Sequence, residues 1–267
     1  MRYSRDRLAE NSLAVERSGV QDDRLAPTSD IPRTRSATSA PPAWLWLWLP
    51  LVIVVVQALL RTLDESLYRT WLRSESGLIE NLTVICLLIA VFHALRLFSL
   101  RDRVRSRTFG AFVIFLALGC AFFAGEELSW GQHWLGFETP EVFAARNEQG
   151  ELNLHNDPAF ELYLDQIPRS LLTLAALFGG IIAPLTFRRG AKRDFETRSM
   201  SGWVWPTAVC LPASVIAVLV TQPKKFIDDL PAYLDISPGE TKELCLALFL
   251  MLYLFELERD LRAGPTA

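Results

Sequence analysis

Six apolar segments, each close to the length that crosses a lipid bilayer, constrain this chain more than any other feature. A helix needs about 20 largely apolar residues to cross the hydrocarbon core, and 51% of the chain is hydrophobic. The segments are residues 43–60, 78–95, 108–125, 167–187, 202–220 and 241–255. We therefore predict an all-α integral membrane protein with six transmembrane helices.

The polar parts of the chain fall outside these segments. Residues 1–42 are rich in Arg, Ser, Pro and Asp and show no apolar periodicity, which predicts a disordered tail. We place a six-span membrane domain at residues 43–260 and a short cytoplasmic tail at 261–267. Between spans three and four, residues 126–166 form a long loop, which we expect to be partly helical.

The basic residues predict how the chain crosses the membrane. Arginines and lysines are frequent in the N-terminal tail and in the connections around residues 96–107 and 188–198, whereas the 126–166 loop contains Arg146 as its only basic residue. Cytoplasmic loops carry an excess of Lys and Arg. Both termini are therefore predicted to be cytoplasmic, and the 126–166 loop to lie on the outer face.

Helix start signals support these boundaries. The sequence Ser-Pro-Gly-Glu at 237–240 is typical of a capping box with proline at the first helical position. Thr-Pro-Glu at 139–141 predicts the start of a short helix within the outer loop.

Ionisable residues gather at the predicted outer ends of spans two and three. The motif GEELSWGQHW covers residues 125–134, and ELNLHN covers residues 151–156. In the predicted topology Glu80, Glu126 and Glu127 share one membrane level, whereas His93 lies near the cytoplasmic side. Charged residues at the end of a span are costly and indicate a function.

Several chemistries fit these residues. Zinc is often held by two histidines and one carboxylate, with a second carboxylate as general base. His133, His155 and Glu127 are our candidate metal ligands, with Glu126, Glu151 and Glu80 as alternative carboxylate ligands.

A metal-free alternative uses Ser129. If span three continues as a helix beyond the membrane surface, Glu126, Ser129 and His133 share one face. Ser129 and His133 would then form a nucleophile–base pair, with Glu126 as the orienting residue.

Non-catalytic roles compete with both chemistries. The carboxylates at one end of a helical bundle could attract a cation. The tryptophans are also typical of an aromatic belt at the membrane interface, and Glu126 and Glu127 could simply end the span by bonding to loop backbone.

The two motifs, together with FETP at 137–140, Asn147 and Gln149, resemble a group of bacterial multi-pass membrane proteins of unknown molecular function. The resemblance implies a bacterial cytoplasmic membrane and brings no assigned reaction. A looser likeness is to membrane-embedded ceramidase-like hydrolases, which place Glu, Ser and His residues at one end of a helical bundle, although this chain lacks their set of several histidines.

Our leading hypothesis is a hydrolase or transferase that acts on a lipid or lipid-linked substrate at the outer leaflet. Its candidate catalytic residues are Glu126, Glu127, His133, His155 and Glu80. The alternative is a non-catalytic membrane component that binds or conducts a cation, or binds a lipid or a partner protein. The expected partners are membrane lipids and other membrane proteins, not nucleic acid.

The metal hypothesis predicts a measurable metal content. Detergent-purified protein should contain near-stoichiometric zinc or another transition metal by plasma mass spectrometry. The His133→Ala/His155→Ala double variant should lose it, because it removes both nitrogen ligands. Metal-free wild-type protein would rule out this mechanism and leave the glutamates as a cation site, a proton site or structural residues.

Overall fold

The computed structural model describes residues 41–73, 77–147, 150–154, 157–186 and 193–264, in which every regular element is a helix. The longer helices are α1 (Leu49–Leu63), α2 (Glu65–Trp71), α3 (Leu78–Ser99), α4 (Thr108–Glu127), α7 (Ile167–Ala175), α9 (Leu211–Leu219) and α10 (Pro238–Ala263). Four-residue helices are α5 (Gln132–Leu135), α6 (Glu141–Ala144) and α8 (Ala183–Thr186). The π-helical segments are η1 (Trp44–Trp48), η4 (Glu161–Gln166) and η5 (Ala176–Ile182). The 3-10 turns are η2 (Arg101–Arg103), η3 (Ser129–Gly131), η6 (Met200–Gly202), η7 (Ala208–Cys210) and η8 (Pro223–Lys225).

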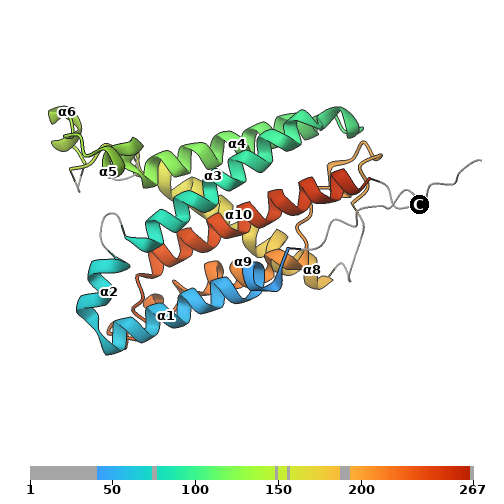
Figure 1. Cartoon of the computed structure of the whole chain (residues 1–267). Helices are drawn as coiled ribbons and strands as arrows, with labels where there is room; N and C mark the ends of the chain where they lie inside the picture. The colour runs from blue at the N-terminus through green and yellow to red at the C-terminus, as the bar shows by residue number, and fades with distance from the viewer. Residues whose placement is uncertain (1–40, 74–76, 148–149, 155–156, 187–192, 265–267) are drawn as a thin grey trace, which may run out of the picture. The chain divides into compact units, whose positions relative to one another are not determined.

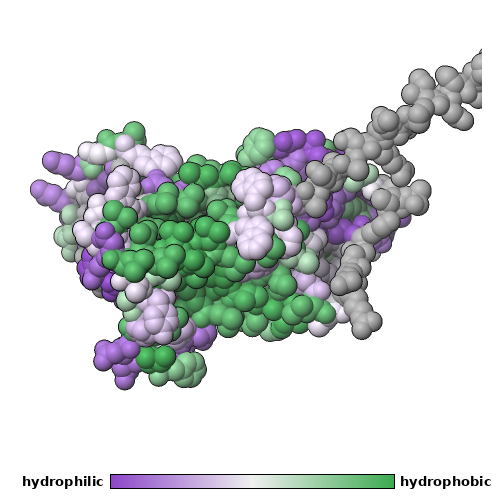
Figure 2. Space-filling model, turned by 60° about the horizontal axis from the view of Figure 1, so that its bottom comes forward, coloured by the Kyte–Doolittle hydropathy of each residue, from purple (hydrophilic) through white to green (hydrophobic). Residues whose placement is uncertain are grey.

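Four continuous helices in the described residues are long and apolar enough to cross a membrane. They are Trp44–Leu63, Leu78–Ser99, Thr108–Glu127 and Glu161–Thr186. These candidate spans match four of the predicted segments in length and composition, and a wide hydrophobic area lies between hydrophilic residues on the face shown in Figure 2.

Helix α10 forms the centre of the helical bundle. It packs against α3 and α9, and α3 packs in turn against α4 (Figure 1). Most of its side chains are buried, including every residue from Leu244 to Leu254. With 26 residues it is roughly 39 Å long, but Glu243, Glu256 and Glu258 near its ends distinguish it from the four apolar spans.

The fifth predicted span is only partly helical. Helix α9 has nine residues, and residues 204–207 before η7 have no regular structure. Pro206 explains the break, because proline lacks a backbone donor and disfavours a helical residue before it. Side chains satisfy two carbonyls of this irregular segment: Tyr253 Oη donates to the Val204 carbonyl over 2.8 Å, and Arg193 Nη2 donates to the Trp205 carbonyl over 3.1 Å.

The two predicted helix starts have different outcomes. Helix α6 begins at Glu141 after Pro140, as expected. Helix α10 begins with Pro238 at its first position, but Ser237 makes no capping bond. The capping-box prediction is wrong there: Ser237 has a left-handed backbone (φ 47°, ψ 66°), unlike the extended backbone of a usual N-cap, and its hydroxyl accepts a hydrogen bond of 2.9 Å from Tyr68 of α2.

An ion pair connects the end of α1 to the loop before α10. Arg61 Nη2 lies 3.2 Å from Asp235 Oδ2. Partial burial favours the neutral form of Asp235, but hydrogen bonding and the charges of Arg61 and Lys224 outweigh it and hold the pKa of Asp235 below its usual value. The carboxylate is therefore ionised at neutral pH and keeps this contact.

The opposite end of the bundle holds His93, as predicted. Its Nδ1 lies 2.6 Å from Glu258 Oε2 near the end of α10, and Arg96 Nε lies 2.9 Å from the other oxygen. Arg262 also pairs with this carboxylate. His93 is thus separate from the polar residues at the ends of α3 and α4 that the outer loop contacts.

Segment η5 approaches α9 closely through Gly180. A Cβ atom at Gly180 would lie 2.7 Å from Ser214 Cβ and 3.1 Å from the Phe249 ring. Only a residue without a side chain fits at this crossing, and small residues likewise allow close approach of helices in membranes.

We expect Gly180→Ala to lower the melting temperature in detergent, because overpacking typically costs about 1–3 kcal/mol. Gly119→Ala is the matched control, since a Cβ there meets no atom within 4 Å among the described residues. Ser214→Gly should restore part of the loss. An unchanged melting temperature in Gly180→Ala would contradict this packing.

Candidate functional site

Helix α4 ends in a sharp break, at the end that the sequence predicts to face outward. Helix α4 ends at Glu127, and Ser129, Trp130 and Gly131 then have φ values of 46°, 53° and 96°. Left-handed backbone is unfavourable for serine and tryptophan. The prediction of one continuous helix face from Glu126 to His133 is therefore wrong.

The break lets Trp130 fold back onto the last turn of α4. A Cβ atom at Gly125 would lie 2.9 Å from the Trp130 ring, so the glycine makes room for the indole. The ring also contacts Phe122 edge-on, with centroids 5.9 Å apart. Its Nε1 donates a hydrogen bond of 2.7 Å to Glu126 Oε1.

Glu126 connects α4 to the distant part of the loop. Its second oxygen, Oε2, accepts a hydrogen bond of 2.7 Å from the backbone N–H of Leu154, 28 residues further along the chain. The residue is only 3% exposed. Because both oxygens accept hydrogen bonds from the loop, the contacts of Glu126 are those of a residue that holds the loop in place.

Ser129 belongs to a buried network with the second motif. Its hydroxyl donates to Glu151 Oε2 over 2.7 Å and accepts from Asn153 Nδ2 over 3.1 Å. Asn153 also donates to Glu151, and Asn147 donates to Asn153. The Ser129 hydroxyl thus donates to Glu151, and the Ser129–His133 pair stays a prediction, because the side chain of His133 is not among the described parts of the structure.

Three further hydrogen bonds hold the loop. The side-chain amide of Gln132 makes two of them: Nε2 donates to Thr139 Oγ1 over 2.6 Å, and Oε1 accepts from the backbone N–H of Leu152 over 2.9 Å. Trp134 Nε1 donates to Asn81 Oδ1 over 3.0 Å, which fixes the loop to the start of α3. The two motifs therefore lie together and hold the outer loop over the ends of α3 and α4.

The two loop histidines are not part of this description. His155 lies outside the described residues, and only the backbone of His133, in α5, is described. In the parts of the chain that the structure describes, no three metal-ligating side chains form a group. The predicted metal site of His133, His155 and Glu127 stays a prediction.

Glu127 points away from the loop network, toward other helices. The charges that act on it most strongly are those of Glu243 and Glu80, followed by Arg169 and Glu240. Glu80 and Glu127 thus lie within electrostatic range of each other, as the shared membrane level predicts.

Arg169 and Glu243 belong to this cluster and were not among the predicted site residues. Arg169 Nη2 lies 2.5 Å from both Glu243 Oε1 and Asp165 Oδ1. Their positions in the sequence could have identified them, because both residues lie at the predicted outer ends of spans, at the level of Glu80 and Glu127.

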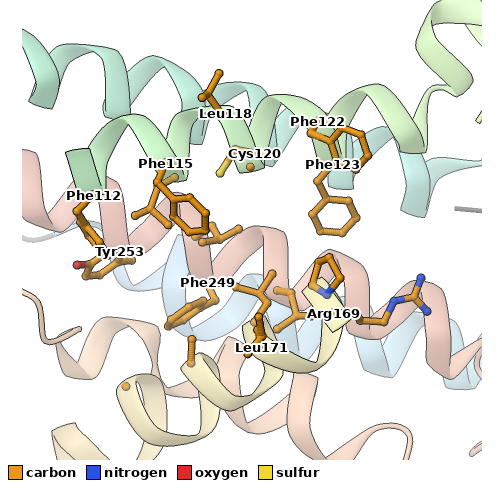
Figure 3. Close-up of a pocket in the computed structure, with 18 of the residues that line it drawn as sticks. Phe112, Phe115, Leu118, Cys120, Phe122, Phe123, Arg169, Leu171, Phe249 and Tyr253 are labelled. Atoms are coloured by element: carbon orange, nitrogen blue, oxygen red, sulfur yellow. The ribbon is translucent and has the colours of Figure 1, made fainter. Parts of the chain in front are cut away.

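A cavity of about 880 Å³ extends from this cluster between α4, α7–η5 and α10. Its wall is largely aromatic and aliphatic, and Phe112 and Tyr253 lie at one end while Arg169 lies at the other (Figure 3). The charged residues that line it are Glu126, Glu127, Asp165 and Arg169. From Phe112 to Glu127 the wall follows α4 for roughly 22 Å.

Comparisons of the chain with protein-family models, curated proteins and solved structures give no match. The functional argument therefore rests on the loop network, the carboxylate cluster and the cavity.

We expect Glu126→Gln to destabilise the outer loop. The carboxylate accepts from two donors, whereas an amide offers one oxygen and one donor group, so one N–H loses its partner at a cost of about 1–3 kcal/mol. Faster proteolysis of the 126–166 loop in detergent, with a lower melting temperature, would show this.

The matched control is Glu138→Gln, which removes the same charge from an exposed position in the loop. It should leave both measurements unchanged. Equal proteolysis of the two variants and the wild type would contradict the structural role of Glu126.

Proposed function

We propose that this protein binds a membrane lipid or a lipid-linked substrate, with its apolar chain in the cavity and its headgroup at the outer end. The observation that carries this proposal is the polarity of the cavity. Its long wall is apolar, while its charged residues come from the outer end of α4 and the start of the α7 segment. Its volume of about 880 Å³ falls within the range of ligand pockets, about 300–1,000 Å³.

The proposal includes the predicted six-span topology in a bacterial cytoplasmic membrane. Helix α10 is long enough to cross, and residues 203–219 could also cross. At about 3.3 Å per extended residue and 1.5 Å per helical residue, residues 203–219 extend roughly 34 Å, which exceeds the roughly 30 Å hydrocarbon core of a bilayer. The arginines near His93 and Glu258 support a cytoplasmic location for that end and for both termini.

The proposed reaction is hydrolysis or group transfer at the headgroup, with Glu127 as general base. Glu127 lines the cavity, and among the described residues it makes no hydrogen bond or ion pair, so its oxygens are available to a substrate. Glu126 is occupied by the loop, which favours Glu127 over its neighbour. Glu80 would be the supporting carboxylate, and His133 and His155 would act as metal ligands or acid–base groups.

The alternative is a non-catalytic membrane component that binds a lipid, cation or partner protein. The ion pairs of Arg169 with Glu243 and Asp165 favour it, because they show that part of the cluster is structural. Glu127→Asp separates the two functions, since a shorter carboxylate keeps the charge but moves the base, and catalytic geometry tolerates little displacement.

Filling the cavity should abolish lipid binding. We expect Leu172→Trp, at a half-buried position in the cavity wall, to lower the amount of co-purified lipid at least about tenfold, as mass spectrometry of organic extracts would show, because the side chain takes the space of the bound chain.

Leu174→Trp is the matched control in the same helix. Leu174 is 48% exposed and does not line the cavity. It should retain wild-type lipid. Equal lipid content in wild type and both variants would refute the proposed binding site.

A further inference from the structure

The outer end of the cavity has more negative than positive charge. Of the four groups whose charges act most strongly on Glu127, three are carboxylates, from Glu243, Glu80 and Glu240, and one is the guanidinium of Arg169. These groups come from α3, α7 and α10, so the excess is not a feature of one helix. Together with Glu127 itself, these groups comprise four carboxylates and one cation. Lys242, whose charge interacts with Glu243, and Arg73, whose charge acts on Glu240, bring the described cations to three, so negative charge is still in excess.

Arg169 is already engaged by other carboxylates. Its Nη2 contacts Asp165 Oδ1 and Glu243 Oε1, each at 2.5 Å. The positive charge of Arg169 is thus already paired with two carboxylates, and Glu127 is not one of them. Asp165 adds a further carboxylate to the lining of the same end.

A carboxylate beside an apolar cavity and several like charges is costly to ionise unless a cation joins it. A ligand with an anionic headgroup would add to this repulsion. A ligand with a positively charged headgroup would relieve it and would find in Glu127 an acceptor that faces the cavity.

From the proposed function, we infer a specific class of ligand: an amphiphile with a positively charged amine headgroup that pairs with Glu127 at the outer end of the cavity. The apolar chain extends along α4 toward Phe112 and Tyr253, which lie at the far end (Figure 3). Glu127 determines the preference for the headgroup, and the cavity wall binds the chain.

The test compares three probes with the same chain: octadecylamine, octadecanol and octadecanoate. Each is titrated into delipidated, detergent-solubilised full-length protein, and affinities are measured by native mass spectrometry. We expect octadecylamine to bind wild type about tenfold more tightly than the other two, since a hydrogen bond between charged groups contributes roughly that factor.

Two variants assign the preference. Glu127→Gln should bind octadecanol as wild type does but lose the preference for the amine, whereas Glu138→Gln, in the exposed loop, should keep it. An amine preference that persists in Glu127→Gln would overturn the assignment to this residue. Equal affinities for all three probes in wild type, or tighter binding of octadecanoate, would overturn the inference.

The cavity variant distinguishes this failure from failure of the proposed function. If Leu172→Trp weakens all three probes while wild type shows no headgroup preference, the cavity binds lipid chains and only the amine is wrong. If wild type binds no probe, or Leu172→Trp binds them as well as wild type, both the proposed function and the inference are refuted.

Discussion

The burial of α10 is the constraint on which the rest of the structure depends. A helix surrounded by other helices is buried along its middle, so its side chains from Leu244 to Leu254 pack against protein, and some of them, including Phe249 and Tyr253, also line the cavity. Its charged residues are confined to the two ends, where Glu243 meets Arg169 and Glu258 meets His93 and Arg96. These two polar ends define the level at which the other helices can pack.

Two adjacent glutamates at the end of α4 have different surroundings. Glu126 faces the loop and accepts hydrogen bonds from Trp130 and Leu154, whereas Glu127 faces the cavity and the charges of neighbouring helices. The left-handed turn at Ser129–Gly131 makes this possible, because it brings the loop back over the helix end. One residue of the pair thus builds the outer loop, and the other is available to a ligand.

The cavity depends on interruptions of regular helix. Val204, Trp205 and Pro206 form part of its wall from an irregular segment, and Gly179 lines it from η5. Irregular backbone at membrane depth needs partners inside the protein, which Tyr253 and Arg193 provide. The same interruption that shortens the fifth helix therefore contributes to the space that we assign to a lipid chain.

The sequence by itself determined the four long apolar helices, since apolar length is a local property. Through the alternation of basic loops it also predicted that Glu80 and Glu127 share a level and that His93 lies apart from them. Only the tertiary structure decided that Ser129 bonds to Glu151, that Ser237 pairs with Tyr68 instead of capping α10, and that Arg169 meets Glu243. Each of these depends on side chains far apart in the chain meeting in space, and so does the cavity, which no periodicity or spacing in one segment can specify.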